Sequence, residues 1–240
     1  MLHKNPAMSK KDCKLILALD LPDRASALDM LSGLRGGLQW VKIGLQMYLK
    51  YGAPFVEEVA RMGFKIFLDL KLFDIPNTVA SAVKSVSDLP ISMLTIHTSA
   101  GEEAMRAALD AAGSANKDLM LLGVTVLTSF DESGLAKTGV ALPPPMQVQL
   151  LAKLACESGM KGLVCSPLEI QMLRKIIPPE TVLVTPGIRP AGSSKDEQKR
   201  VMTPSMAADA GADFIVVGRP ILKAQDPAKA AGAIIAELEA

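Results

Sequence analysis

Three charged residues, Asp69, Lys71 and Asp74, lie within six positions of one another. They accompany an apolar run, Lys65–Leu70, of the kind that forms a buried β-strand. Side chains alternate between the two faces of a strand, so Asp69 and Lys71 should point to one face and Leu70 to the other. The result is a candidate catalytic cluster in which each charge favours the ionised form of its neighbour. A salt-bridge network that only orients the following loop uses the same residue types, and this interpretation stays open.

Polar residues also stand at or near the ends of most other apolar runs. Lys42 lies in the second run, and Asp20, which ends the first, offers it a carboxylate partner. A snorkelling lysine and a turn-forming aspartate are the structural alternatives. His97 ends the fourth run, but a lone histidine there is more often structural than catalytic. The remaining strand-end residues are Thr128, Thr185, Arg189, Gly218 and Arg219. Because the active site of a (β/α)₈ barrel is built from the carboxyl ends of its strands, this distribution favours a site at one end of such a barrel.

The elements that would position these residues alternate regularly along the chain. Short apolar runs separated by amphipathic segments are typical of β-α-β units and a parallel sheet. Eight such units predict a single-domain (β/α)₈ TIM barrel of the α/β class, and an open doubly wound sheet is the alternative. We expect a polar N-terminal extension over residues 1–12 and the barrel over residues 13–240. The predicted strands are Lys14–Leu19, Gln39–Ile43, Lys65–Leu70, Ser92–Ile96, Leu119–Val126, Gly162–Cys165, Val182–Val184 and Phe214–Val217. The predicted helices include Gln46–Met62, Thr78–Ser87, Glu102–Ala112, Met146–Ser158, Pro167–Lys175, Ser205–Ala210 and Pro227–Leu238.

A phosphate site is predicted near the end of the eighth strand. The run Phe214–Val217 leads directly into Gly218 and Arg219. Glycine lets backbone N–H groups approach an anion closely, and arginine adds a bidentate donor. The long loop after the seventh strand supplies Arg189 and Gln198, and in many barrels these two loops bind phosphate. A solvated polar loop is the alternative.

Composition narrows the classes of partner. The formal net charge is +1, from 26 basic and 25 acidic residues. The chain therefore lacks the excess of basic residues that is typical of proteins that bind nucleic acid or anionic membranes. Three cysteines with no CxxC spacing indicate reduced thiols, and two histidines make a histidine-based metal site improbable. We see no apolar segment of signal-peptide or membrane-helix length and therefore expect a cytoplasmic protein.

Several motifs resemble those of the orotidine 5′-phosphate decarboxylase family. The main one is DLKLFDIPNT at Asp69–Thr78, supported by LALD and VKIG in the first two strands and by VTPGIRP and VVGRPI in the last two. The resemblance covers nearly the whole chain. The bare Asp-x-Lys-x-x-Asp pattern also occurs in related sugar-phosphate decarboxylases and synthases, whereas the continuation DIPNT is more specific. The chain departs from the family pattern in having DEQ where DDQ is expected and in its polar extension.

The resemblance implies decarboxylation of orotidine 5′-monophosphate to uridine 5′-monophosphate, without metal or organic cofactor, as a step of pyrimidine synthesis. It also implies a homodimer in which Asp74, Ile75 and Thr78 reach the neighbouring subunit's site. The charge array would comprise Lys42, Asp69, Lys71 and Asp74, with Lys71 as the proton donor. Asp20 would bind the ribose, with Lys42 nearby, and Thr128 would lie at the pyrimidine. Arg189, Gln198, Gly218 and Arg219 would hold the phosphate.

Two other functions remain possible at this point. The first is a metal-dependent relative such as a 3-keto-L-gulonate 6-phosphate decarboxylase or a hexulose-phosphate aldol enzyme, for which a Mg²⁺ requirement is the discriminating observation. The second is a catalytically inactive barrel that binds nucleotides, for which tight binding without turnover is the discriminating observation. The intact charge array argues against the second, because a binding protein has no need of it.

Overall fold

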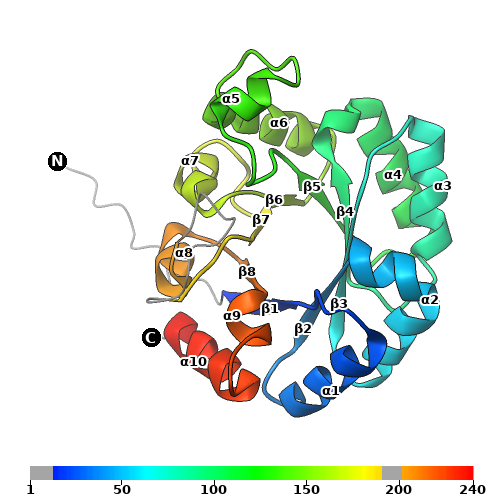
Figure 1. The fold of residues 1–240 in the computed structure, drawn as a ribbon. Helices are drawn as coiled ribbons and strands as arrows, with labels where there is room; N and C mark the ends of the chain where they lie inside the picture. Colours follow the sequence, from blue (N-terminus) through cyan, green and yellow to red (C-terminus); the bar gives the residue numbers. More distant parts are fainter. Residues whose placement is uncertain (1–12, 191–201, 240) are drawn as a thin grey trace.

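The computed structural model describes residues 13–190 and 202–239, which form a closed barrel of eight parallel strands (Figure 1). The strands follow one another around the barrel in chain order, and β8 pairs with β1 to close it. This confirms the predicted single-domain TIM barrel and excludes the open sheet. The strands are β1 Lys14–Ala18, β2 Trp40–Gly44, β3 Lys65–Leu72, β4 Met93–His97, β5 Met120–Val124, β6 Gly162–Val164, β7 Val182–Thr185 and β8 Phe214–Val217. The predicted extension over residues 1–12 and the predicted site residue Gln198 lie outside the described residues.

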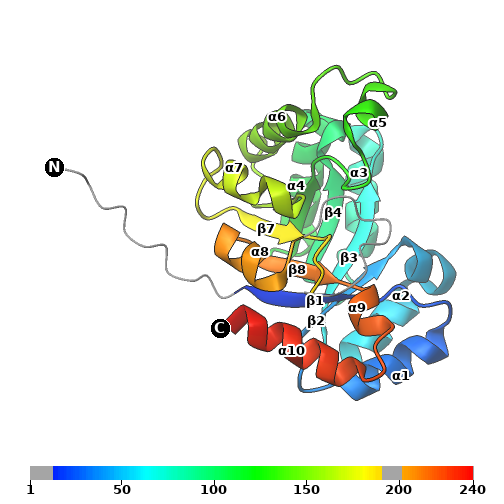
Figure 2. The same cartoon turned by 60° about the vertical axis from the view of Figure 1, so that its left-hand side comes forward.

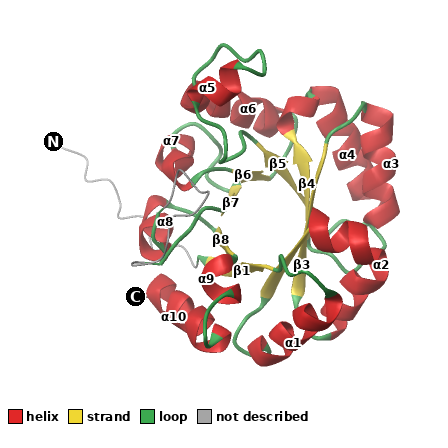
Figure 3. Cartoon of the chain, viewed as in Figure 1, coloured by secondary structure: helices red, strands yellow, loops and turns green. Residues whose placement is uncertain are grey.

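Helices form the outer layer around the strands (Figure 3). The turned view shows α10 running alongside α1 and β1, so the C-terminal helix packs against the first β-α unit (Figure 2). The helices are α1 Arg24–Leu34, α2 Leu45–Arg61, α3 Pro76–Val86, α4 Glu102–Ala115, α5 Glu132–Ala136, α6 Pro144–Glu157, α7 Ile170–Arg174, α8 Pro204–Ala210, α9 Arg219–Leu222 and α10 Pro227–Glu239, with short 3₁₀ turns at Thr98–Ala100 and Pro167–Glu169.

The structure differs from the predicted elements in one helix that is divided and in three helices that were not predicted. The predicted helix Pro167–Lys175 is a 3₁₀ turn followed by α7, and the carboxylate of Glu169 accepts a hydrogen bond from the N–H of Ser166 at the start of that turn. Helices α5 and α9 have five and four residues, too few to show a helical period, and they were not predicted. Helix α1 was also absent from the prediction.

Alternation along the strands divides the core into two layers. Residues on one face fill the barrel interior, and those on the other pack beneath the helices. The interior layer fills the middle of the barrel with side chains, and in barrels of this kind the ligand binds above it, at the carboxyl ends of the strands. Its members are Ile16, Ala18, Trp40, Phe67, Met93, Leu122, Val184 and Val216.

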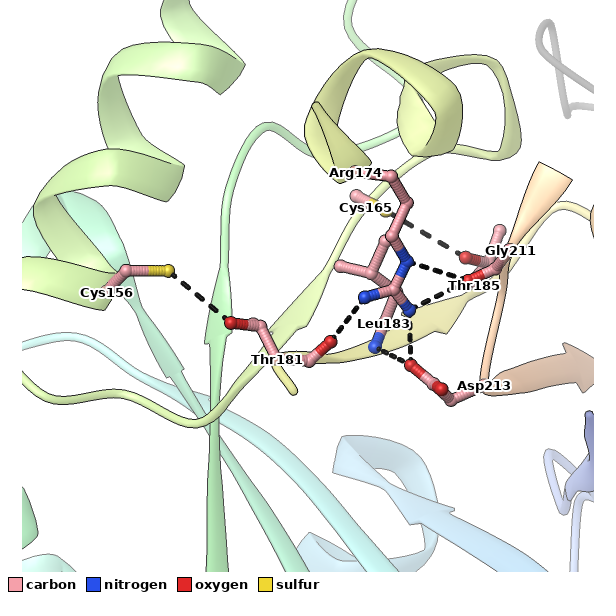
Figure 4. A network of polar contacts seen from close by, with 8 residues as sticks. All are labelled: Cys156, Cys165, Arg174, Thr181, Leu183, Thr185, Gly211 and Asp213. Carbon is pink, nitrogen blue, oxygen red and sulfur yellow. Dashed lines mark hydrogen bonds and ion pairs between the residues drawn. The ribbon is translucent and has the colours of Figure 1, made fainter. Parts of the chain in front are cut away.

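A polar clasp around Arg174 joins α7 to the amino ends of β7 and β8 (Figure 4). The guanidinium contacts a carboxylate oxygen of Asp213 at 2.5 Å and donates to the carbonyls of Thr181 and Gly211 at 2.6 to 2.9 Å. The same carboxylate oxygen accepts from the N–H of Leu183 at 2.7 Å. Only 9% of the Arg174 side chain is exposed, so these groups depend on one another rather than on water.

Replacing Arg174 with Met should lower the free energy of unfolding by about 3 to 5 kcal/mol, because it removes a cation in contact with a mostly buried carboxylate and the guanidinium donors to two carbonyls. Urea denaturation followed by circular dichroism measures this difference. The clasp lies at the end of the barrel remote from the charged cluster, so the rate per folded molecule should stay at the wild-type value. A loss of stability below 1 kcal/mol would show that the clasp is dispensable.

Candidate active site

The charged cluster lies where β1, β2 and β3 end. The ammonium of Lys71 lies 2.7 Å from a carboxylate oxygen of Asp69. The ammonium of Lys42 lies between two carboxylates, 3.5 Å from Asp69 and 3.4 Å from Asp20. The order Asp20, Lys42, Asp69, Lys71 is therefore a chain of alternating charges across three neighbouring strands. The proximity that the sequence predicted for these four residues is found.

Asp69 is the buried centre of this chain. Burial alone would raise the pKa of its carboxyl, but the ammonium groups of Lys42 and Lys71 and the hydrogen bonds from Lys71 and Thr95 outweigh this and hold the pKa below its ordinary value. Asp69 is therefore ionised at neutral pH. A buried carboxylate in contact with an ammonium holds that ammonium in place, in a position from which it can stabilise negative charge in the cavity.

The backbone at Lys71 is irregular, which the sequence did not predict. Lys71 has a φ of +50°, the single positive value outside glycine in the part of the chain that the structure describes. The pairing of β3 with β4 shifts between Leu68 and Leu72, so this segment bulges from the ladder. A left-handed conformation costs a residue with a side chain about 1 to 3 kcal/mol and persists only where its surroundings hold it. Asp69 and Lys71 thus come together through a bulge and not through regular alternation.

A cavity of about 280 Å³ opens beside the cluster. Its charged wall carries Lys42, Asp69 and Lys71, and its rim carries Thr128 and Ser129. The rest of the lining is apolar apart from one thiol and consists of Phe67, Val124, Val126, Leu127, Val164, Cys165, Pro186 and Val216. An ammonium that faces an apolar wall acts in a medium of low dielectric constant, where its field on a bound ligand is strong.

The segment after β3 turns away from its own cavity. Asp74, Ile75 and Thr78 are all exposed, and Ile75 has 66% of its surface accessible. The carboxylate of Asp74 accepts a hydrogen bond from the N–H of Ile75, and no contact between it and Lys71 is found in the described residues. Within one chain, therefore, these three predicted site residues do not join the cluster. Phe73 beside them is 63% exposed.

The predicted phosphate residues lie at the ends of the last two strands. Arg189 is buried after β7, and its guanidinium donates to the carbonyl of Ile188 at 2.8 Å. Gly218 follows the last residue of β8 and precedes α9, Arg219 begins α9, and both are partly exposed. A Cβ atom at Gly218 would lie 3.3 Å from the Cβ of Ala18, so the backbone there passes close to β1. None of the three lines the 280 Å³ cavity itself.

Sequence reasoning missed one polar residue inside the cluster. Thr95 is fully buried in β4, and its hydroxyl contacts Asp69 and Lys71. The only signal in the sequence was a hydroxyl between the apolar residues Leu94 and Ile96. His97, at the end of β4, faces a separate cavity of about 510 Å³, where its ring meets Phe73 edge-on. Burial and the charge of Lys71 lower the pKa of His97, so it is neutral near pH 7.

Two structural properties bear on the class of protein. None of the helices in the described ranges combines the length and apolar character that a membrane-spanning segment requires. Over the same ranges, we find no grouping of three or more His, Cys, Asp or Glu side chains arranged to hold a metal ion.

A cavity of about 540 Å³ opens at the amino ends of β1 and β2, next to Lys14 and Trp40, far from the charged cluster.

Comparison with known proteins agrees with this architecture. The chain is 52% identical to an orotidine 5′-phosphate decarboxylase of Opitutus terrae, over 95% of this chain and 99% of that protein. It is 46% identical to the protein of the same name from Dichelobacter nodosus, over 93% and 98%. A crystal structure of orotidine 5′-phosphate decarboxylase from Lactobacillus acidophilus superposes with a TM-score of 0.84 at 38% identity, over 95% of this chain and all of that one. The model of the orotidine 5′-phosphate decarboxylase / HUMPS family matches residues 13–234, and the chain belongs to this family.

Proposed function

We propose that this protein is a carboxy-lyase that converts orotidine 5′-monophosphate to uridine 5′-monophosphate and CO₂ in pyrimidine synthesis, without a metal or organic cofactor. The observation that carries the proposal is the ammonium of Lys71, held 2.7 Å from the buried carboxylate of Asp69 beside a largely apolar cavity. Family membership and the names of the relatives support the choice of substrate.

Lys71 performs the central step in this proposal. When the bond between C6 of the pyrimidine and its carboxylate breaks, CO₂ leaves and the electron pair stays on C6. The Lys71 ammonium stabilises that charge and then transfers a proton to C6, and solvent later returns a proton to the amine. Asp69 holds and orients the Lys71 ammonium. In this proposal the Asp69 carboxylate, which lines the cavity, also repels the carboxylate of the substrate, and the loss of CO₂ relieves that repulsion.

The other groups bind the rest of the nucleotide in this proposal. Asp20 and Lys42 hold the ribose, and Thr128 faces the pyrimidine from the cavity rim. The phosphate lies at the ends of β7 and β8, where Arg189, Gly218 and Arg219 bind it. Gln198, which lies outside the described residues, is proposed as a further phosphate ligand. Contacts that far from C6 supply binding energy that organises the reacting centre.

We further propose that the protein is a homodimer in which Asp74, Ile75 and Thr78 complete the neighbouring subunit's site. The exposed apolar side chains around the barrel mouth support this, because a patch of this kind is typical of an interface. They are Leu45, Leu49, Phe73 and Ile75. Asp74 also lacks a contact with its own Lys71, which leaves it available to a partner. The proposed location is the cytoplasm, supported by three cysteines that form no disulfide within the described chain.

Mixing two inactive variants tests the shared site. Lys71→Asn and Asp74→Asn dimers should each be inactive, and after subunit exchange about one quarter of the sites should be intact, because each hybrid dimer carries one site with both native residues. The assay is decarboxylation before and after mixing. Mixing Lys71→Asn with Asp69→Asn is the matched control and should restore nothing, because those residues serve the same site. Recovery absent from both mixtures would contradict the shared site.

The activity itself is tested by the loss of orotidine 5′-monophosphate absorbance when the purified protein is added in excess EDTA. Rapid conversion to uridine 5′-monophosphate is the expected result. Turnover of sugar phosphates that depends on Mg²⁺, with no conversion of the nucleotide, would assign the chain to the metal-dependent members of the superfamily. Tight binding of uridine 5′-monophosphate without any turnover would identify a nucleotide-binding protein.

A further inference from the structure

The hydroxyl of Thr95 connects two parts of the charged cluster. It lies 2.9 Å from one carboxylate oxygen of Asp69 and 2.8 Å from the backbone nitrogen of Lys71. The other carboxylate oxygen of Asp69 faces the ammonium groups of Lys71 and Lys42. Thr95 itself has no exposed surface. Both carboxylate oxygens are therefore occupied, one by the lysines and one by this hydroxyl.

The direction of these hydrogen bonds follows from the chemistry of the partners. A backbone N–H can only donate, so the Thr95 oxygen accepts from Lys71. An ionised carboxylate can only accept, so the single hydroxyl proton goes to Asp69. A hydroxyl is the smallest side-chain group that satisfies both demands at once. Valine has the same shape and satisfies neither.

The position of Thr95 coincides with the irregular backbone of β3. Lys71 has a φ of +50° and lies within the shift in the β3–β4 register. Thr95 lies on β4 directly opposite this bulge, and its oxygen receives the Lys71 N–H. Without that acceptor, the N–H would be buried in a bulge with no hydroxyl to receive it, and the left-handed conformation would lose a contact that holds it.

We propose that Thr95 is a positioning residue for the Asp69–Lys71 pair: its hydroxyl fixes the rotation of the carboxylate and the backbone of the lysine together, and so aims the Lys71 ammonium at the cavity. The proposal rests on the proposed function, in which Lys71 transfers a proton to the substrate. Thr95 does not line the cavity, so its effect reaches the substrate only through these two residues.

The prediction is that Thr95→Val lowers kcat by about 100-fold, since a displacement of about 1 Å in a catalytic group has an effect of that size. KM should change by less than about threefold, because the residues proposed to bind ribose and phosphate are not in contact with Thr95. Thr95→Ser keeps the hydroxyl and should stay within about threefold of wild-type kcat. Steady-state kinetics on the three proteins, with their melting temperatures, give this comparison.

Thr98→Val is the matched control. Thr98 is equally buried, one residue beyond β4, and its hydroxyl donates to the carbonyl of Val124 at 2.9 Å, away from Asp69 and Lys71. It should lower stability without lowering kcat. Equal losses of kcat in Thr95→Val and Thr98→Val, or a serine variant as slow as the valine variant, would overturn the proposal. If Thr95→Val does not fold, Thr95→Cys, which keeps the volume but hydrogen-bonds weakly, should fall between the serine and valine variants in stability and well below serine in kcat.

Crystal structures of the same variants separate this proposal from the proposed function. In Thr95→Val the Lys71 backbone should leave the left-handed region or the contact between its ammonium and Asp69 should lengthen, whereas Thr95→Ser should keep both. An unchanged Lys71 in the valine variant would overturn the positioning role even if the wild-type protein decarboxylates the nucleotide. A wild-type protein without decarboxylase activity would overturn the proposed function while the crystallographic result still decides the role of Thr95 in the fold of the cluster.

Discussion

Replacing Lys71 with Ala should reduce kcat for orotidine 5′-monophosphate by about 10⁴ to 10⁷-fold. The estimate combines loss of a proton donor, typically about 10² to 10⁴-fold, with loss of the charge that stabilises the carbanion, typically about 10² to 10³-fold. Among the described residues, the Lys71 ammonium lies nearest to Asp69, at 2.7 Å. The Lys42 ammonium lies 3.5 Å from Asp69 and also contacts Asp20, so it does not replace Lys71 in the variant. Single-turnover kinetics at saturating substrate give the chemical step directly.

The backbone at Lys71 calls for a second variant. Alanine is strained at a φ of +50°, so a slow Ala variant alone leaves a distorted site as the explanation. Asparagine tolerates the left-handed region better and also lacks the ammonium, so Lys71→Asn should be as slow as Lys71→Ala. Both should keep a cooperative melting transition and bind uridine 5′-monophosphate. A kcat near wild type in either variant would refute the role of Lys71 as proton donor.

Replacing Arg219 with Ala should lower kcat/KM by about 10² to 10⁴-fold, since two charge-assisted hydrogen bonds to a phosphate are worth about 3 to 5 kcal/mol together. Arg219 begins α9, separated from β8 by Gly218 alone, and it belongs to neither core layer, so its removal leaves both layers intact. Steady-state kinetics and the melting temperature are the measurements. The loss should fall on both kcat and KM if phosphate contacts also organise the reacting centre.

A substrate without phosphate isolates this contact. The nucleoside orotidine should react slowly with the wild-type protein and equally slowly with Arg219→Ala, because the missing arginine then has nothing to bind. Arg61→Ala is a suitable control: it also removes one positive charge, but its side chain is 70% exposed at the end of α2 and should leave the kinetics unchanged. An Arg219→Ala protein with wild-type kinetics would place the phosphate elsewhere.

The strands could be predicted from the sequence because each is a short apolar run between turn-forming residues. Phe214–Val217 was predicted with the boundaries that the structure has, and the four charges from Asp20 to Lys71 were placed at one end of the barrel. The role of Thr95 could not be predicted in this way, because the bulge opposite it depends on the register between β3 and β4. That register is set by packing of whole strands and not by local residue preference.

The clasp at Arg174 was unpredictable for a related reason. Its partner Asp213 lies 39 positions away, and neither residue stands in a motif.

Asp74 illustrates the opposite case: its spacing from Lys71 suggested a single cluster, yet the turn after β3 carries it outward. A short spacing in sequence fixes which strand end a residue belongs to, but the direction of its side chain depends on the loop.

The pairing of β1 with β8 has a consequence for synthesis of the chain. β1 begins at Lys14 and β8, with which it pairs, ends at Val217, so the chain through Val217 must leave the ribosome before the sheet can close. Until then β1 presents one row of unpaired N–H and C=O groups, as does the most recently made strand at the other edge, and exposed edges of this kind pair readily with other chains. Closure therefore comes late and links residues far apart in sequence, which slows folding and makes the nascent barrel a natural client for chaperones.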